Sequence, residues 1–229
     1  MTGWELRQPV ASGIRVEHSD AARRALNLAV AVLGLLFAAP IMFLIAVLIK
    51  LTSRGPILYT QTRVGVDRRQ ELPASTNHRR TSDQGGRPFT IYKFRTMYTA
   101  DPRSAPEVWA TKNDPRVTPV GRVLRKYRLD ELPQFLNVLR GEMNVVGPRP
   151  EQPKIFAQLR EQLPGYQRRQ RVPPGITGWA QVNQRYDTSI DDVRRKVSFD
   201  LEYVARRSVI EDLRILARTV PVVLNKGGW

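Results

Sequence analysis

The 229-residue sequence contains no cysteine, and histidine occurs only as His18 and His78. A chain without cysteine forms no disulfide bond and offers no thiolate to a metal ion. Two histidines are too few for the usual four-ligand zinc sites. Any divalent ion would therefore be held by oxygen ligands, which favours Mg²⁺.

Acidic residues are scarce beside basic ones. Asp and Glu total 21, Lys and Arg total 37, and the formal net charge is +16. This excess predicts an anionic partner such as nucleic acid, acidic lipid or a phosphorylated substrate. Arginine far outnumbers lysine, so an arginine-biased composition is the alternative explanation. No nucleic-acid-binding motif accompanies the charge, and we expect no nucleic-acid partner.

Charge is absent altogether from Ala25 to Ile49. A helix over this range would rise about 37 Å, against a hydrocarbon core of about 30 Å, so its length is sufficient to cross a membrane. Pro40 interrupts the stretch, and neither arm of a helix broken there would cross the core alone.

Basic residues flank the apolar stretch on both sides, with Arg23 and Arg24 before it and Lys50 and Arg54 after it. Basic flanks favour the cytoplasmic side of a membrane. A re-entrant hairpin keeps both flanks inside, whereas a spanning helix places one outside. The hairpin frees backbone carbonyls in lipid, which need partners. From the residues alone, both arrangements stay open.

Two stretches downstream have the polarity alternation of strands. Gly55 to Gly65 and Pro88 to Thr96 are rich in Ile, Tyr, Phe and Thr, and we expect them to pair. Between them, Asp67 to Arg87 is polar and lacks periodicity, which predicts a long mobile loop. Val172 to Gly178 (VPPGITG) is expected to be a turn-rich loop.

Helical periodicity appears in three later segments. A helix is expected from about Asp130 to Gly141, and two amphipathic helices over Ile190 to Arg206 and Val209 to Leu224. The last of these either packs on the domain or lies on a lipid surface.

Asp130 and Glu131 are adjacent carboxylates at the predicted start of a helix, preceded by Arg125 and Arg128. Such residues commonly cap a helix and need no further role. The alternative is that the basic residues bind a phosphate while an ionised Asp attacks phosphorus.

Three further positions allow both a structural and a functional interpretation. Arg149 lies between Pro148 and Pro150, which either make a rigid turn or hold its guanidinium at a fixed angle. Trp179 could stack on a base or fill the core. Lys93 lies within a strand, where a structural lysine normally points to solvent.

Taken together and in this order, the motifs resemble the bacterial sugar transferase family, the monotopic phosphoglycosyl transferases that act on polyprenyl phosphate. The resemblance runs from about Arg23 to Leu224. It rests on the proline-broken apolar segment and on these motifs: GPILYTQTRVG, IYKFRTM, LDELPQFLNVLRGEMNVVGPRPE and PGITGWAQVN.

The resemblance implies an α+β fold: a mainly helical cytosolic domain around a small antiparallel sheet. Residues 1–24 would be a cytoplasmic segment, 25–50 a re-entrant membrane helix broken at Ala39 and Pro40, and 51–229 the catalytic domain with its mobile loop at 67–87. The chain would lie at the cytoplasmic face of the bacterial inner membrane and contact its phospholipids. The oligomeric state is not implied.

The resemblance also implies transfer of a sugar 1-phosphate from a UDP-sugar to polyprenyl (undecaprenyl) phosphate, with release of UMP, to start exopolysaccharide or other glycoconjugate synthesis. Asp130 would be the nucleophile that forms an aspartyl-phosphosugar intermediate, and Glu131 its partner. Both would serve an Mg²⁺ cofactor. Substrate and phosphate binding would fall to the following residues: Lys93, Arg125, Arg149, Arg171, Trp179 and Gln181.

This sequence departs from the family pattern at two sites. Ala39 stands where a serine often precedes the breaking proline, and Pro173 stands where many members have arginine, which would shift a phosphate contact to Arg171. Two other interpretations are kept: a membrane-tethered nucleic-acid-binding protein, and a scaffold or inactive homologue. The intact Asp130–Glu131 pair argues against a scaffold.

Overall fold

The computed structural model describes residues 17–67, 85–98, 114–184 and 189–224. The expected mobile loop between Asp67 and Arg87 falls mostly on residues 68–84, outside the described residues. Most of the expected N-terminal segment, 1–24, also lies outside them.

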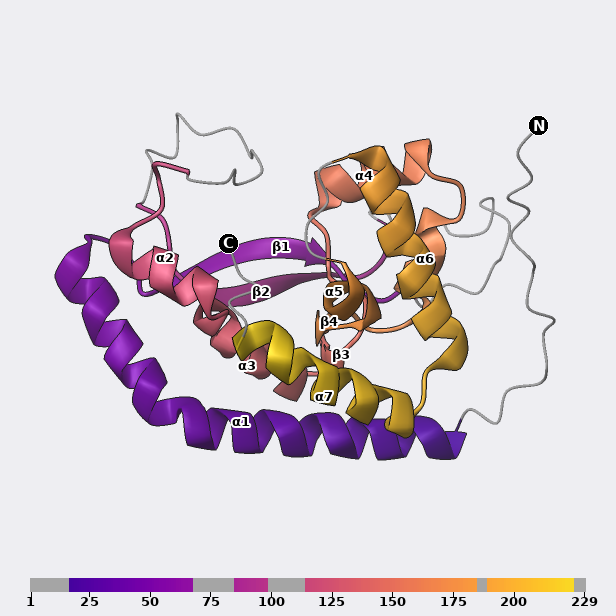
Figure 1. Ribbon diagram of the computed structural model, residues 1–229, viewed down its shortest axis with the longest axis horizontal. Coiled ribbons are helices and arrows are strands. Elements are labelled where there is room, and N and C mark those ends of the chain that lie inside the picture. The colour runs from indigo at the N-terminus through magenta and orange to yellow at the C-terminus, as the bar shows by residue number, and fades with distance from the viewer. Residues whose placement is uncertain (1–16, 68–84, 99–113, 185–188, 225–229) are drawn as a thin grey trace.

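The first element, α1, is one helix from Glu17 to Thr52 that contains Pro40. Figure 1 shows that α1 runs along one edge of the molecule and bends part-way along its length. Proline fixes φ close to the helical value but removes one backbone donor and crowds the preceding turn, so a helix can continue through it with a bend. The interruption expected at Ala39 and Pro40 therefore does not divide the element in two.

Much of the apolar surface of α1 has no protein cover. The segment Asp20–Thr52 is long and apolar enough to cross a membrane. Phe37 and Phe43 are 78% and 74% exposed, whereas Ala31 and Ile45 on another face are buried against the domain. An exposed apolar surface of this extent is typical of a membrane or protein interface.

Two small sheets organise the domain. Strands β1 (Leu58–Val64) and β2 (Pro88–Phe94) pair in antiparallel fashion with Tyr59 opposite Lys93, which confirms the expected pairing. Strands β3 (Asn144–Val146) and β4 (Gly175–Thr177) pair in parallel. A loop was expected throughout Val172 to Gly178, and this expectation is wrong for Gly175–Thr177, which form β4.

The parallel pair depends on close backbone approach at its glycines. A Cβ atom on Gly175 would lie 2.1 Å from the backbone nitrogen of Gly147, so only glycine fits there. A strand of three residues is too short to show alternation, which is why the sequence pattern did not reveal it.

Helices surround these sheets (Figure 1). The helices after α1 are α2 (Pro119–Lys126), η2 (Leu129–Gln134), α3 (Phe135–Leu139), α4 (Pro153–Gln162), η3 (Tyr166–Arg171), α5 (Trp179–Asn183), α6 (Ile190–Arg206) and α7 (Val209–Leu224). Both closing helices have the predicted bounds. The helix predicted from Asp130 is a 3₁₀ turn, η2, followed by α3.

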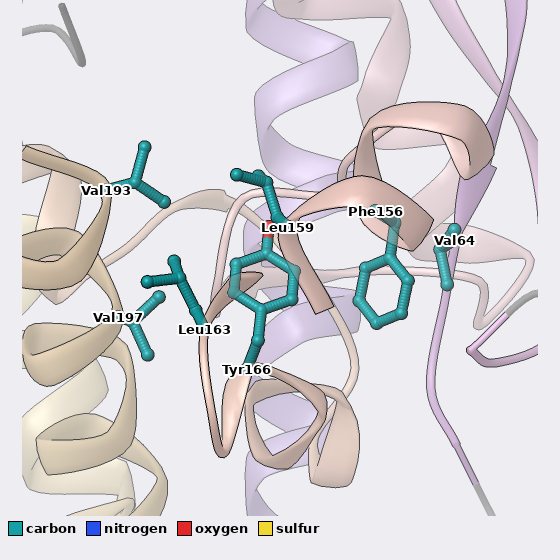
Figure 2. Close-up of a cluster of buried hydrophobic side chains, with 7 residues drawn as sticks. All are labelled: Val64, Phe156, Leu159, Leu163, Tyr166, Val193 and Val197. Atoms are coloured by element: carbon teal, nitrogen blue, oxygen red, sulfur yellow. The ribbon is translucent and has the colours of Figure 1, made fainter. Parts of the chain in front are cut away.

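One buried cluster joins β1 to α4, η3 and α6 (Figure 2). Phe156 packs against Tyr166 with ring centroids 5.2 Å apart, and Val64 contributes from β1. Val193 and Val197 complete the cluster from α6. Burial of these apolar side chains packs η3 against β1, the strand that pairs with β2 and its Lys93.

A polar link ties the N-terminal part of α1 to the rest of the domain. Arg23 donates to Asp212 of α7 at 2.9 Å and to the Tyr203 hydroxyl of α6 at 2.6 Å. The Asn27 side chain accepts the backbone N–H of Val145 in β3 at 2.5 Å. We name the contacts of Arg23, Asn27, Tyr203 and Asp212 the α1 latch, and it connects the apolar helix directly to the strand that precedes Arg149.

Candidate functional site

The two adjacent carboxylates lie in η2, just after a sharp turn. Arg128 has φ 55° and ψ 21°, a left-handed conformation that is unusual for a residue other than glycine. The turn separates α2 from η2 and directs the chain inward, so Asp130 and Glu131 are only 8% and 6% exposed. Backbone strain of this kind is often found at functional sites.

Glu131 is held by basic side chains from distant parts of the chain. Its Oε1 accepts from Lys93 at 2.8 Å and from Arg149 at 2.7 Å. Arg128 lies 4.0 Å from its other oxygen. Burial alone would raise the pKa of Glu131, but Arg149, Lys93 and Arg128 hold it well below the usual range. Glu131 is therefore ionised near neutral pH.

Asp130 has a different environment. Its Oδ2 lies 4.0 Å from Lys93, beyond hydrogen-bonding distance. Burial raises the pKa of Asp130, the Glu131 charge adds to the rise, and Lys93 and Arg149 oppose it. The result is a poorly solvated carboxylate whose oxygens are not tied up in a short ion pair, which suits a nucleophile.

Lys93 points to Glu131 from β2, not to solvent, and its side chain is 17% exposed. The fully buried Asn137 of α3 pins this strand. Its amide donates to Thr90 O at 2.7 Å, and its oxygen accepts from Tyr92 N at 3.2 Å. Sequence reasoning missed Asn137, although a polar residue among the apolar positions of the predicted helix was the available signal.

Arg149 reaches Glu131 from the segment after β3. Its backbone carbonyl accepts from Arg169 at 2.9 Å, and the carbonyl of Pro150 accepts from Arg63 at 3.2 Å. The two prolines and these bonds fix the backbone, while the side chain is 36% exposed beside the carboxylate. A solvated arginine in a rigid turn does not account for a 2.7 Å bond to a buried Glu131.

The other predicted site residues lie at varying distance from this centre. Arg125 donates to Thr96 at 2.9 Å, and its charge helps lower the pKa of Asp130. Arg171 is exposed at the end of η3. The Trp179 indole donates to Glu202 at 3.0 Å and the Arg218 guanidinium lies 4.9 Å from its ring, so Trp179 is held by α6 and α7.

A pocket of about 220 Å³ has Glu131 in its lining. Gln181 shares this pocket with Glu131 and Arg128, and its amide donates to Ile176 O at 3.0 Å. The structure thus brings Asp130, Glu131, Lys93, Arg149 and Gln181 to one region. Arg128, which the sequence suggested as one of the basic residues that bind phosphate, lies 4.0 Å from Glu131.

The arrangement suits chemistry on phosphate groups. One carboxylate is available to attack, the other is locked by cations, and guanidinium and ammonium groups can bind phosphate oxygens. Within the described ranges no three His, Cys, Asp or Glu side chains gather as a metal-binding group.

The bacterial sugar transferase family matches residues 18–226 of the chain. The UDP-N-acetylgalactosamine-undecaprenyl-phosphate N-acetylgalactosaminephosphotransferase of Aeromonas hydrophila is 39% identical over 206 residues, which are 90% of this chain and 44% of that protein. The UDP-glucose:undecaprenyl-phosphate glucose-1-phosphate transferase of Escherichia coli K12 is 42% identical over 200 residues, 86% of this chain and 39% of that protein.

The chain therefore spans less than half of these two relatives. By contrast, the exopolysaccharide production protein PSS of Rhizobium leguminosarum bv. phaseoli is 37% identical over 210 residues, 90% of this chain and 96% of that protein. The match covers the apolar helix, both sheets and the carboxylate pair, and the chain belongs to the bacterial sugar transferase family.

Proposed function

We propose that the chain transfers a sugar 1-phosphate from a UDP-sugar to polyprenyl phosphate and releases UMP, initiating the synthesis of exopolysaccharide or another glycoconjugate. The observation that carries the proposal is the buried pair in which Glu131 is locked by Lys93 and Arg149 while Asp130 is not. The names of the Aeromonas and Escherichia relatives include both substrate classes, a UDP-sugar and undecaprenyl phosphate.

In the first step, a carboxylate oxygen of Asp130 attacks the phosphorus that carries the sugar. A P–O bond forms to Asp130, and the bond from that phosphorus to the oxygen bridging the two phosphates breaks. UMP leaves with the bridging oxygen and its electron pair. The product is an aspartyl-phosphosugar, and this step needs Asp130 to be ionised.

In the second step, a phosphate oxygen of the polyprenyl phosphate attacks the same phosphorus. The bond to Asp130 breaks, the carboxylate is restored, and the product is a polyprenyl diphosphate sugar. Splitting the reaction in this way lets two polyanions visit the site in turn instead of meeting each other directly.

The basic side chains offset the negative charge of both substrates. Lys93 and Arg149 are already within 2.8 Å of Glu131, so they are oriented before a phosphate arrives. The guanidinium of Arg149 can bind two phosphate oxygens at once. Such preorganised charge stabilises the transferring phosphoryl group.

Mg²⁺ fits the donor set only in combination with a substrate. Protein sites for Mg²⁺ commonly use one or two carboxylates and complete the shell with phosphates and water. Asp130 and Glu131 are two such carboxylates, and the second Glu131 oxygen, Oε2, lies 4.0 Å from Arg128, beyond hydrogen-bonding distance. When bound there with a diphosphate, the ion would neutralise developing charge on the leaving phosphate.

Replacing Asp130 by asparagine tests the proposal. Wild-type protein mixed with a UDP-sugar alone, drawn from a panel of glucose, galactose and their N-acetylated forms, should release one equivalent of UMP and gain the mass of one sugar phosphate. Asp130→Asn should show neither, with turnover lower by at least about a thousandfold. Asp191→Asn, on the exposed surface of α6, is the matched control.

The outcomes separate the alternatives. Because asparagine caps a helix about as well as aspartate, a purely capping role predicts near-normal turnover in Asp130→Asn. Near-normal turnover in Asp130→Asn, together with no adduct in wild type supplied with UDP-sugar alone, would indicate direct transfer between the two substrates. Absence of turnover in wild type with every UDP-sugar would favour the scaffold interpretation.

The proposal includes a re-entrant α1 at the cytoplasmic face of the inner membrane. The exposed apolar side chains of α1, its bend and the basic residues on both flanks support this placement. Cysteines placed at positions 15 and 60 should both react only with a reagent applied from the cytoplasmic side. Labelling of one from each side would establish a spanning helix. Pro40→Ala should shift the population toward spanning, because a straighter helix is long enough to cross.

A further inference from the structure

The pocket beside Glu131 is lined mainly by hydrocarbon. It lies among η2, α3, β4, α5 and α7, and its volume is about 220 Å³. Leu132, Ile176, Val222 and Val223 supply much of its wall. The catalytic steps proposed above assign nothing to this apolar space, although Glu131 lies in its lining.

The pocket has two chemically different ends. Arg128 and Glu131 lie in its lining, and Lys93 and Arg149 are within 2.8 Å of Glu131. From α7 come two aliphatic side chains, Val222 and Val223, together with Thr219, whose hydroxyl is paired with that of Thr177. A ligand that fits both ends carries an anionic group joined to hydrocarbon.

The pocket also adjoins the apolar surface of α1. Its wall residue Phe135 packs so closely on Gly34 of α1 that a Cβ there would lie 2.9 Å from the ring. Next to Gly34 along α1, Leu33 and Leu36 are 51% and 66% exposed. Phe135 therefore lies between α1 and the pocket whose lining includes Glu131.

We infer that this pocket seats the isoprenoid carbons nearest the phosphate of the polyprenyl acceptor. The inference rests on the proposed function. A pocket of this size accommodates a short length of chain, and the remainder of a long lipid stays with the apolar surface of α1. The donor is the poorer occupant, because sugar and nucleotide hydroxyls placed against hydrocarbon lose hydrogen bonds to water without replacement.

Steady-state kinetics on Val222 variants of the full chain in detergent test the inference. Val222→Gln puts an amide into the pocket wall, and Val222→Phe reduces its volume. Both should raise the KM for undecaprenyl phosphate by about tenfold, about 1.4 kcal/mol. The KM for the UDP-sugar and the UMP burst without acceptor should remain at wild-type values. Thermal melting checks that each variant folds.

Val220→Gln is the matched control, because Val220 lies on the same helix, is 57% exposed and is outside the pocket lining. It should leave the acceptor KM unchanged. An acceptor KM that is equal in all three variants and wild type would overturn the inference. A raised KM for the UDP-sugar with an unchanged acceptor KM would assign the pocket to the donor instead. Failure of the proposed function is distinct: wild type itself would release no UMP.

Discussion

Two clusters of buried charged residues flank the Pro148–Pro150 segment, and they differ in how completely their charges are paired. In the first, Arg169 donates to Asp200 at 2.9 Å and to Tyr166 at 2.9 Å, and Glu151 pairs with Lys196 at 2.7 Å. We call this the Arg169 cluster. In the second, Glu131 forms both short ion pairs, with Lys93 and Arg149, and Asp130 lies 4.0 Å from Lys93.

The difference teaches which buried charges hold the fold and which can react. The side chains of Arg169 and Asp200 are 0% and 2% exposed and lie 2.6 Å apart. The pKa of Glu151 is lowered to about 2 by Lys196 and Arg169 despite burial. Burial raises the pKa of Asp130, as it also raises that of Asp200 in the Arg169 cluster, so the direction of the pKa shift does not separate the two clusters. The pairing distance does: Asp200 lies 2.6 Å from Arg169, whereas Asp130 lies 4.0 Å from Lys93, which fits the reactive role proposed for Asp130.

The largest expected effect comes from breaking the Arg169 cluster. Arg169→Met leaves Asp200 buried without its main partner and frees the carbonyl of Arg149. We expect a loss of about 3–5 kcal/mol in the free energy of unfolding, because one buried charge is left uncompensated. Arg194→Met, which removes an exposed ion pair with Asp191, should cost at most about 1 kcal/mol. Thermal unfolding of both variants in detergent measures the contrast, which equal losses would contradict.

A smaller effect, on turnover and not on stability, is expected at Arg149. Arg149→Lys keeps the positive charge but loses the planar fork that can bind two phosphate oxygens. Turnover should fall by at least about tenfold, about 1.4 kcal/mol of transition-state stabilisation, with little change in melting temperature. Wild-type turnover in this variant would limit Arg149 to its ion pair with Glu131 and exclude a two-oxygen phosphate contact.

The pH profile distinguishes the lysines of the two clusters. The reaction needs ionised Asp130, so kcat/KM should fall as the pH drops through the raised pKa of Asp130. Lys93 lowers that pKa, so Lys93→Met should move the acidic limb to higher pH. Lys196→Met removes the partner of Glu151 and should leave the limb in place. If the acidic limb of kcat/KM lies at the same pH in both variants, Lys93 does not lower the pKa of Asp130.

The smallest expected effect concerns strain at Arg128. Arg128→Gly removes the Cβ penalty of its left-handed backbone, worth about 1 kcal/mol, and should raise the melting temperature by about 2–4 °C. Arg122→Gly, in the regular part of α2, should lower it, because glycine costs about 1 kcal/mol within a helix. A lower melting temperature in both variants would show that no strain is stored at Arg128.

Much of the fold could be predicted because its elements carry long periodic patterns. The β1–β2 pair and the bounds of α6 and α7 follow from alternation and helical spacing over seven or more residues. The β3–β4 pair could not, since three residues show no period. The change from 3₁₀ to α geometry after Gln134 also has no clear sequence signal.

The site was predictable in its residue types, and less so in its contacts. Nothing in a single sequence places Lys93 and Arg149, 56 positions apart, on the same carboxylate oxygen. The raised pKa of Asp130 depends on burial, which local sequence does not report. The substrate roles predicted for Lys93, Arg125, Arg149, Arg171, Trp179 and Gln181 remain predictions, and the contacts of Trp179 with Glu202 and Arg218 give it a structural role as well.

The α1 latch has a geometric consequence for the proposed reaction. Arg23 and Asn27 fasten α1 to α7 and to the strand that precedes Arg149, which in turn contacts Glu131. A protein seated in a bilayer by α1 then holds Asp130 at a constant height relative to the lipid headgroups. The latch would thereby set the depth of the reaction: only an acceptor phosphate at that height could reach Asp130. This would select lipid-borne acceptors over those free in the cytosol.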